Sequence, residues 1–341
     1  WLDPIFCAIF AIMCVASIIG ARHLHRDTLY YSALIWALAT LLCLRRIQRR
    51  DFAQMQRVRQ VQGGAALALV CAVCLYGMAN ARTLRVTEYA VTLEGAGEDM
   101  TVALLADLHL GYSTDPAYIE RAAQAVNDMQ PDLIVVAGDI FDNEYEAVPE
   151  PDRIAAALAS MHSTYGAYAC WGNHDLSEPI LAGFTWDTED EEKNDPQMAG
   201  FLRRAGINLL EDEKVTLKNG VQLVGRKDPS RDRKLGDERL SPAEWAGLLE
   251  PEKPAFVIDH QPKELEALAE AGFDLDLSGH THDGQVFPSN LIMGFLWENP
   301  CGMVQIKDMF SVVTSGLGVW GPDMRVGTAS EVVKISVHFG G

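Results

Sequence analysis

Three apolar runs, separated by polar segments, dominate the first quarter of the chain. Pro4–Ala21 and Gly63–Met78 are almost free of charge, and Leu29–Leu44 is a shorter run of the same kind. A helix needs about 20 apolar residues to cross a bilayer, although snorkelling flanks allow a shorter run to do so. We therefore predict a membrane anchor of about three transmembrane helices over residues 1–80. The alternatives are a buried hairpin with one anchor helix, or a signal peptide at the first run, which no basic segment precedes.

From about residue 99 the pattern changes to short apolar runs that alternate with segments of helical periodicity. Strands are expected at Thr101–Ala106, Leu133–Ala137, Tyr168–Trp171, Ala255–Ile258 and Leu275–Leu277. Helices are expected at Pro116–Met129, Ile154–Met161 and Glu264–Ala271, and after the capping box that begins at Ser241. Continuous apolar strands between helices are typical of an α/β domain whose sheet is buried on both faces. We expect a lead-in strand or linker at 81–98 and one large domain at 99–341.

The formal net charge of -19 is unevenly distributed along the chain. Residues 1–90 contain ten Arg and four Asp or Glu, which leaves 18 of the 28 basic and 43 of the 47 acidic residues for the rest. Proteins that bind nucleic acid neutralise its phosphates with Lys and Arg, so a domain this acidic is a poor partner for nucleic acid. Of the seven Cys, only Cys170 and Cys301 lie outside the apolar runs, which indicates neither a disulfide framework nor a zinc finger.

Basic residues in the short loops predict how the anchor is oriented. The segment after the second apolar run contains six Arg, whereas the segment before it contains only Arg22 and Arg26. We therefore expect the six-Arg segment in the cytoplasm. With three spans in the cytoplasmic (inner) membrane, the chain after Met78 emerges on the extracytoplasmic side. If one run does not span, the large domain faces the cytoplasm instead.

Each of the five expected strands is followed directly by polar residues of the kinds that bind metal ions. These clusters are Asp107-Leu-His109, Gly138-Asp139-Ile-Phe-Asp142, Gly172-Asn173-His174-Asp175, Asp259-His260 and Gly279-His280-Thr-His282. Ligands in α/β sheets bind beyond the carboxyl ends of the strands, so we expect the clusters to converge at one edge of the sheet. Taken singly, each cluster is as typical of a turn or a surface loop as of a site. Their joint order and placement favours a metal centre, because buried polar groups need partners.

With these five motifs in this order, residues 99–340 resemble the calcineurin-like metallophosphoesterase superfamily. The resemblance implies a four-layer α/β sandwich of two mixed β-sheets flanked by helices, with two divalent metal ions. The seven implied metal ligands are Asp107, His109 and His282 for one ion, Asn173, His260 and His280 for the other, and Asp139 as the bridge. The resemblance also implies two catalytic residues. His174 would face the scissile phosphate as a proton donor or transition-state stabiliser, and Asp175 would orient His174.

The chemistry of the motifs agrees with this resemblance. Carboxylate, amide and imidazole ligands suit Mn, Zn or Fe better than a Cys site would, and Mg is also compatible. Two such ions can clamp the attacking and leaving oxygens of a phosphate ester and supply the positive charge that an acidic domain lacks. We therefore predict a metal-dependent phosphoric ester hydrolase, of the phosphodiesterase or phosphatase type.

A narrower resemblance, to the membrane-associated bacterial branch of the superfamily, involves the last part of the chain. It rests on Gly279-His-Thr-His-Asp-Gly-Gln285, on Gly316-Leu-Gly-Val-Trp-Gly321 and on Arg325. It implies that Gly318 to Arg325 border the pocket and that Arg325 holds a phosphate oxygen; the alternative is a structural β-turn with a surface Arg. Gly is common in that branch where Asp283 stands here, so the substrate preference of the branch is not carried over.

Two further stretches bear on the substrate. Leu291–Trp297 is strongly apolar and closely follows the last motif, either as a core segment or as a contact for acyl chains or the membrane. Gly225–Lys234 is the one basic cluster of the acidic domain, either as a solvated loop or as a site for a second phosphate or a lipid headgroup. With the anchor, they favour a phosphodiesterase that works among membrane lipids on a lipid-linked or envelope phosphate substrate.

Three other functions are weighed against this one. A pyrophosphohydrolase of the UDP-2,3-diacylglucosamine type, from lipid A synthesis, resembles the chain in its metal motifs and requires a domain that faces the cytoplasm. A non-catalytic membrane sensor would have lost metal ligands, and none is missing from the motifs. A nuclease is disfavoured by the acidic charge and the anchor. The oligomeric state is not indicated by the sequence.

Overall fold

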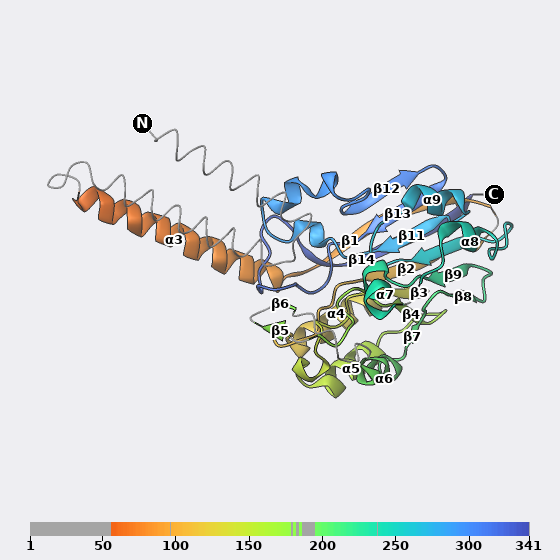
Figure 1. The fold of residues 1–341 in the computed structure, drawn as a ribbon, viewed down its shortest axis with the longest axis horizontal. Helices are drawn as coiled ribbons and strands as arrows, with labels where there is room; N and C mark the ends of the chain where they lie inside the picture. Colours follow the sequence, from red (N-terminus) through yellow and green to blue (C-terminus); the bar gives the residue numbers. More distant parts are fainter. Residues whose placement is uncertain are drawn as a thin grey trace. The chain divides into compact units, whose positions relative to one another are not determined.

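The computed structural model describes residues 56–95, 97–178, 180–181, 184–185, 195–236 and 238–340. The first two expected membrane spans and most of the Arg residues used for the orientation lie outside these ranges. The chain divides into two compact units, Trp1–Val73 and Cys74–Gly341. The second unit contains both large sheets and every residue of the expected site (Figure 1).

Helix α3 (Gln56–Ala81) contains the third apolar run. Its segment Gly63–Ala81, of 19 residues, is long and apolar enough to cross a membrane, and it is the one helix of this kind among the described residues. Large apolar side chains such as Leu67, Leu75 and Tyr76 are exposed on it. The structure therefore supports one candidate membrane helix and does not confirm several.

The last turns of α3 are held against the loop that follows residue 323. The side-chain amide of Asn80 donates hydrogen bonds to the carbonyl oxygens of Arg325 and Thr328, at 3.1 Å and 2.8 Å. The backbone N–H of Arg325 donates to the carbonyl oxygen of Gly77 at 2.9 Å. A side chain at Gly77 would not fit, because its Cβ would lie 2.9 Å from Cε of Met324. The end of the helix is thus part of the second unit in packing as well as in sequence.

The first sheet has six strands and carries the three earliest motifs at its strand ends. Its order is β1 (Leu84–Glu94), β14 (Ser330–Gly340), β2 (Met100–Leu105), β3 (Leu133–Ala137), β4 (Ala167–Cys170) and β7 (Ile207–Leu209). Strands β2, β3, β4 and β7 are parallel, whereas β14 is antiparallel to β2 and parallel to β1. Strand β1 falls within the expected lead-in segment.

The second sheet also has six strands and carries the last two motifs. Its order is β12 (Gly302–Ile306), β13 (Met309–Val313), β11 (Leu275–Ser278), β10 (Ala255–Ile258), β9 (Gln222–Gly225) and β8 (Glu213–Thr216). The four inner strands are parallel, and the edge strands β12 and β8 are antiparallel to their neighbours. A separate pair is formed by β5 (Ile180–Leu181) and β6 (Phe184–Thr185).

The two sheets pack face to face, and helices cover their outer faces (Figure 1). Apolar side chains of both sheets, such as Leu104, Val135 and Leu277, form the core between them. The first sheet is covered by α4 (Pro116–Asp128), α5 (Pro151–Ala159) and α6 (Pro196–Arg204). The second is covered by α8 (Pro242–Ala246) and α9 (Leu265–Glu270), while α7 (Pro229–Leu235) follows β9. The expected α/β fold with two mixed sheets is therefore confirmed.

Local signals in the sequence explain where several elements begin. Asp115 accepts a hydrogen bond from the N–H of Ala117 and so caps α4, whose first residue is Pro. The capping box predicted at Ser241 is present, because Ser241 and Glu244 bond each other's backbone N–H groups. Helix α5 begins at Pro151, three residues before the expected start, since Pro suits the first helical position.

Candidate metal centre

The five motifs meet between the carboxyl ends of strands from both sheets. Asp107, Asp139 and Asn173 follow β2, β3 and β4 of the first sheet. His260 follows β10 of the second sheet, and His280 follows β11 closely. We expected the motifs along one sheet edge; they instead come from two sheets whose strand ends face each other. This arrangement lets ligands approach a centre from two sides.

The first group of ligand-type side chains consists of Asp107, His109 and His282, all of them buried. Nε2 of His109 lies 3.0 Å from Nε2 of His282. That same nitrogen of His282 lies 3.7 Å from Oδ1 of Asp107. The three ligand atoms therefore surround one point. The Asp107 carboxylate also accepts the backbone N–H of His280 at 3.0 Å, which ties the first motif to the last.

The second group consists of Asp139, His260 and His280, with Asn173 beside them. Nε2 of His260 lies 3.1 Å from Nδ1 of His280 and 3.2 Å from Oδ1 of Asn173. It also lies 3.2 Å from Oδ2 of Asp139. Four ligand atoms from four motifs thus face a second point, in the same combination that the resemblance implied.

Asp139 lies between the two groups. Its Oδ2 atom is 3.2 Å from Nε2 of His260 and 3.7 Å from Nε2 of His109. Its Oδ1 atom accepts the backbone N–H of His174 at 2.7 Å. One carboxylate oxygen thus faces both groups, while the other accepts a hydrogen bond from the loop that carries His174.

The donor geometry fits metal ions at both points. Nδ1 of His260 lies 2.9 Å from the carbonyl oxygen of Ala137, and a proton on Nδ1 satisfies that contact and leaves the lone pair of Nε2 for a metal ion. Two pairs of imidazole nitrogens lie 3.0 Å and 3.1 Å apart, the first pair buried and the second partly buried. Nitrogens this close share either a proton or a cation, so both pairs are placed to hold a metal ion. Carboxylate, amide and imidazole donors match Mn, Zn or Fe.

Burial and neighbouring charges shift the pKa values of these groups. Burial raises the pKa of Asp107 to about 6, although His260 opposes the shift. Burial acts in the same direction on Asp139, but the charges of His260 and His174 hold the pKa of its carboxyl well below the usual range. Burial and repulsion by His109 hold the pKa of His282 well below its usual range. Ionised Asp139 and neutral His282 are the forms in which these side chains bind metal ions.

The backbone is strained where the ligands are placed. Five of the expected ligands have left-handed backbone conformations, with φ between 44° and 70°: Asp107, His109, Asp139, His280 and His282. Such conformations cost about 1–3 kcal/mol each, although Asp and His adopt them more readily than most residues. Asp283, directly after the last motif, also has a positive φ, of 50°. Gly138 precedes Asp139 with φ of 75°, and a Cβ there would lie 2.6 Å from Nδ1 of His260.

His174 lies beside the first group, and its ring contacts a residue that the sequence reasoning missed. Nδ1 of His174 lies 2.6 Å from Oδ1 of Asn143. The carboxylate of Asp175 instead accepts the backbone N–H groups of Phe141 and Gly172, at 2.8 Å and 2.7 Å. The orienting role expected of Asp175 would therefore act through the loop that carries His174. Asp175 fastens the loop, and Asn143, which directly follows the Gly138–Asp142 motif, meets the ring.

Arg325 occupies a different place from the one expected of a substrate ligand. Its side chain is 0% exposed, and its Nη2 donates to the carbonyl oxygens of Ser315 and Gly318 at 2.6 Å and 2.7 Å. Nη2 also lies 3.2 Å from Nδ1 of His282, and Nη1 donates to the carbonyl oxygen of His282. A guanidinium enclosed in this way is not presented to a phosphate. It contacts His282 through the Nδ1 side of the ring and the backbone carbonyl, and so supports this residue.

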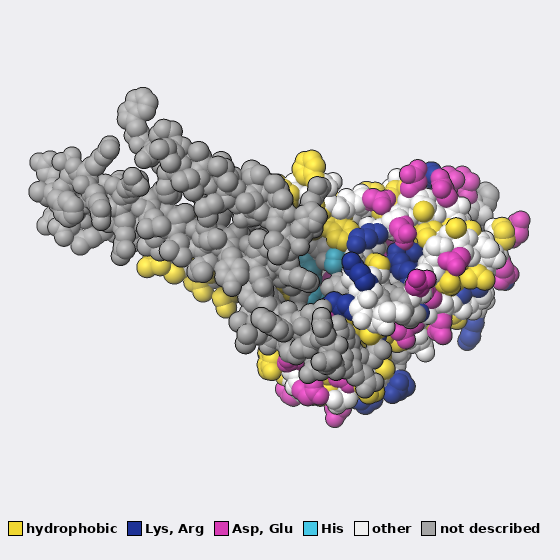
Figure 2. Space-filling model, viewed as in Figure 1, with side chains coloured by type: hydrophobic (Ala, Val, Ile, Leu, Met, Phe, Trp, Pro, Cys, Tyr) yellow, Lys and Arg dark blue, Asp and Glu magenta, His cyan; other side chains and the backbone are white. Residues whose placement is uncertain are grey.

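Two further contacts near the ligands were not predicted from the sequence. Asp142 forms a third group of ligand type with His109 and His174, and its Oδ1 lies 3.4 Å from Nδ1 of His109. The ring of Trp297 packs edge-on against His280, with 4.8 Å between the ring centroids. Asp142 belongs to the second motif and Trp297 to the apolar stretch Leu291–Trp297, but no local pattern in the sequence indicates either contact. Figure 2 shows histidine atoms at the surface beside basic and hydrophobic side chains.

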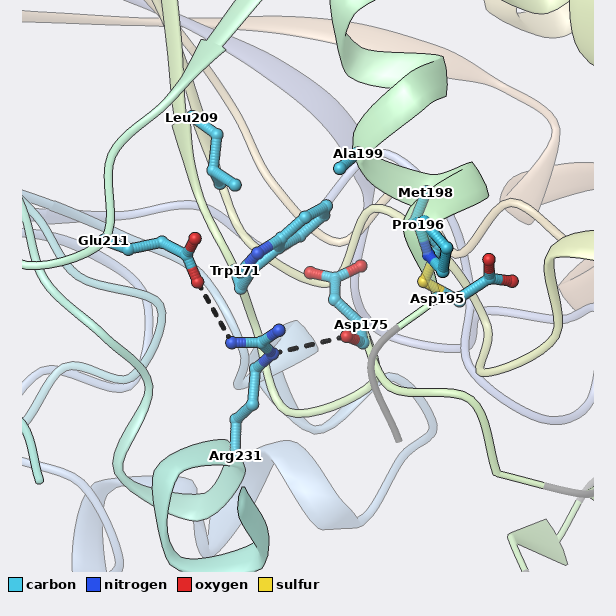
Figure 3. Close-up of a pocket in the computed structure, with 9 residues that line it drawn as sticks. All are labelled: Trp171, Asp175, Asp195, Pro196, Met198, Ala199, Leu209, Glu211 and Arg231. Carbon is cyan, nitrogen blue, oxygen red and sulfur yellow. Dashed lines mark hydrogen bonds and ion pairs between the residues drawn. The ribbon is translucent and has the colours of Figure 1, made fainter. Parts of the chain in front are cut away.

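The basic cluster at 225–234 is engaged within the protein. Arg226 is buried and pairs with Asp259, and Lys234 pairs with Glu178. Arg231 extends across a pocket of about 290 Å³ (Figure 3). There its side chain donates to the carboxylate of Glu211 at 3.2 Å and to the carbonyl oxygen of Asp175 at 3.4 Å. These pairings disfavour the cluster as a phosphate site. The pocket borders the Asp175 loop and is lined by none of the seven expected metal ligands.

The chain is similar in sequence to several proteins named as metallophosphoesterases. A protein of Helicobacter pylori named as an uncharacterized metallophosphoesterase is 27% identical over 266 residues, covering 74% of this chain and 63% of its own length. A zebrafish transmembrane protein with metallophosphoesterase domain is 27% identical, covering 89% of this chain and 70% of its own. The UDP-2,3-diacylglucosamine pyrophosphatase LpxG of Chlamydia trachomatis is 25% identical, in a match that covers 55% of this chain and 64% of its own length. The chain thus spans less than two thirds of the length of its Helicobacter pylori relatives.

Residues 100–284 match the calcineurin-like phosphoesterase family, a range that contains all five motifs. The groups of carboxylate and imidazole ligands that meet in the structure are consistent with a phosphoester hydrolase of this kind. As the match extends over more than half of its residues, the chain belongs to the calcineurin-like phosphoesterase family.

Proposed function

We propose that this protein is a hydrolase of phosphate esters that depends on two divalent metal ions and prefers diesters. The observation that carries the proposal is the position of Asp139, whose Oδ2 atom faces both groups of ligands. Bound there, two metal ions would activate water near neutral pH and stabilise charge on the phosphate oxygens. The seven ligands proposed from the motifs hold these ions, and Mn, Zn or Fe suit the donors best.

The remaining residues of the site position the phosphate and the proton. His174 lies at the edge of the first group, with its ring centroid 5.2 Å from that of His109. There it donates a proton to the leaving oxygen or stabilises the transition state. Asn143 sets the orientation of its ring, and Asp175 holds the loop through two backbone N–H groups. We propose no direct role for Arg325 in substrate binding.

The test uses the full chain purified in detergent. Its bound metal is quantified, removed with a chelator, and restored as Mn, Zn, Fe or Mg, while hydrolysis of bis-p-nitrophenyl phosphate and p-nitrophenyl phosphate is followed. We expect metal-restored hydrolysis that favours the diester and is abolished in Asp139→Asn. Asp128→Asn, at an exposed position of α4, is the matched control and should retain activity. Absence of bound metal in the folded protein would sink the proposal.

The same site would act on phosphate groups of membrane lipids or of the cell envelope. Support comes from the candidate membrane helix Gly63–Ala81 and from relatives named as transmembrane proteins. The extracytoplasmic orientation that we expect from the Arg distribution requires three spans. A reporter fused after Gly341 tests it, because alkaline phosphatase is active only outside the cytoplasm and a fluorescent reporter that folds in the cytoplasm gives the opposite signal.

A second candidate function is hydrolysis of the diphosphate bond of a nucleotide-linked lipid. It is favoured by two relatives named as UDP-2,3-diacylglucosamine pyrophosphatase LpxG, at 25% and 24% identity. The discriminating experiment gives the full chain UDP-2,3-diacylglucosamine and measures release of UMP. Release at a rate far above that of bis-p-nitrophenyl phosphate, together with a cytoplasmic domain, would favour this candidate. Hydrolysis of diesters without UMP release would exclude it.

A further inference from the structure

A stretch beside the metal centre exposes large apolar side chains. We call Phe287–Trp297 the apolar ledge; it contains the short helices η3 (Ser289–Leu291) and η4 (Met293–Phe295) and no charged residue. The exposed fractions of its side chains are 56% for Phe287, 64% for Leu291, 38% for Ile292, 82% for Phe295 and 48% for Leu296. The ledge is therefore not the core segment that was one reading of its sequence. Exposed apolar patches of this kind mark contact surfaces.

The ledge has a defined backbone. The N–H of Leu291 donates to the carbonyl oxygen of Pro288, and that of Trp297 donates to Met293 at 3.0 Å. The N–H of Phe287 donates to the carbonyl oxygen of Val326 at 2.7 Å. The apolar side chains are thus exposed on a segment whose backbone is held by hydrogen bonds.

The ledge is joined to the candidate membrane helix through one short loop. Val326, which bonds Phe287, lies close to Gly77 of α3, because a Cβ at Gly77 would be 3.2 Å from Cγ2 of Val326. The neighbouring Arg325 donates its backbone N–H to Gly77. Gly77 belongs to the segment Gly63–Ala81 that is apolar enough to span a membrane. The ledge therefore begins where that segment ends.

The other end of the ledge reaches the metal centre. Trp297 packs against His280, one of the ligands of the second group. Nζ of Lys263 lies 5.1 Å from the centroid of the Trp297 ring, and the Lys263 side chain is exposed. Trp is enriched at the boundary between a membrane and water, and Lys can keep its charged end in the water there. The apolar surface thus ends in a polar rim next to the site.

We propose that the apolar ledge inserts into the surface of the bilayer that α3 enters, and that it presents membrane lipids with phosphate headgroups to the metal centre. The second part of this proposal, the access of lipid phosphates to the metal centre, rests on the proposed phosphoesterase function. Apolar side chains without nearby charge enter the boundary between headgroups and acyl chains, to a depth of about 5–10 Å. Lys263 then attracts the headgroup phosphate. A second copy of the chain is the competing occupant.

The insertion is tested without any catalytic step. The full chain is reconstituted into phosphatidylcholine vesicles that contain a lipid with a photoreactive diazirine in its acyl chain, and labelled peptides are identified by mass spectrometry. We expect label on α3, which serves as the internal control, and on residues 287–297. Label on α3 alone would overturn the proposal. Cross-links between the ledges of two copies, without lipid label, would overturn it in favour of a dimer.

The access of lipid phosphates is tested by comparing two substrates in one variant. Leu291→Asp/Phe295→Asp places charges on the ledge, and Leu248→Asp, at a position that follows α8 and is 51% exposed, is the matched control. We expect the ratio of phosphodiester hydrolysis in vesicle lipid to hydrolysis of bis-p-nitrophenyl phosphate to fall at least tenfold in the ledge variant only. An unchanged ratio would refute lipid presentation, whereas inactivity of the unaltered protein towards both substrates would refute the phosphoesterase function itself.

Discussion

Asn143 and His174 are in direct contact, with 2.6 Å between Oδ1 of Asn143 and Nδ1 of His174. Asn143 is itself held in place, because its Nδ2 donates to the carbonyl oxygen of Leu176 at 3.3 Å. For the proton transfer that we propose for His174, a proton on Nδ1 that faces Asn143 would make Nε2 the nitrogen that meets the substrate. Asn143, which follows the second motif, thus contacts the ring that the third motif contributes.

Asn143→Ala should therefore lower kcat by about tenfold or more while the bound metal stays constant, since a freely turning ring loses part of the 10²- to 10⁴-fold that a general acid contributes. The measurement is kcat and KM for bis-p-nitrophenyl phosphate, with metal content as the control. Asn143→Asp keeps an acceptor for Nδ1 and should recover part of the rate with a shifted pH profile. Equal losses in both variants, with loss of metal, would indicate a structural role only.

His174→Ala separates the two roles proposed for this residue. If His174 gives its proton to the leaving oxygen, the rate should fall by about 10²- to 10⁴-fold for an alkyl or phenyl ester and much less for a p-nitrophenyl ester, whose leaving group needs no proton. Rates are compared across diesters with leaving groups of increasing pKa. A loss that is the same for all of them would indicate that His174 stabilises the transition state.

Arg325→Met should weaken metal binding, because Arg325 contacts both the ring and the carbonyl oxygen of His282. Residues that support a metal ligand typically contribute about 10- to 100-fold to metal affinity. The measurement is the metal concentration that restores half of the activity after chelation. Arg153→Met, at an exposed position of α5, is the matched control. Unchanged metal affinity with a raised KM would return Arg325 to the substrate role that its sequence position implied.

Asp276 should make stability depend on pH. Burial raises its pKa to about 7, and its carboxyl accepts hydrogen bonds from Ser278 and Ser311. Because the unfolded chain releases this proton near pH 4, the folded state binds more protons between about pH 4 and 7. Its contribution to stability is therefore present below pH 4 and is lost as pH rises to 7. The slope for one proton is about 1.4 kcal/mol per pH unit.

Asp276→Asn removes this dependence. The Tm of the full chain in detergent, measured from pH 4 to 8, should rise relative to that of the unaltered protein as pH increases, and the difference should level off above about pH 7. Asp128→Asn on the surface of α4 provides the comparison. A Tm difference that is constant over the whole range would show that Asp276 does not take up a proton on folding.

Much of the fold could be predicted because it depends on local patterns. Strands β3 and β10 have the expected bounds, since unbroken runs of apolar residues between turn residues are buried from both sides. The capping box at Ser241 was recognisable because its two partners are three residues apart. The ligand-type residues were recognisable for a similar reason, since each motif lies at the end of a strand.

Other features of the site could not be predicted, because they join residues far apart in the chain. Nothing near Arg325 indicates that it lies behind His282, 43 residues away, or that Asn80 bonds its carbonyl oxygen. The contact of Trp297 with His280 depends on the path of the apolar ledge. Leu291–Trp297 is equally compatible with a core segment and an exposed surface until its neighbours are known.

By itself, the sequence determined five of the strands and four of the helices in their order, the ligand types at those strand ends, and an apolar segment long enough to span a membrane. These follow from the spacing of residues within one element, which local forces control. Only the tertiary structure decided that the motifs come from two sheets, that Asp139 lies between two groups of ligands, and that Arg325 is enclosed. Those relationships arise when the inner faces of both sheets are buried against each other, and this packing brings distant strand ends to one place.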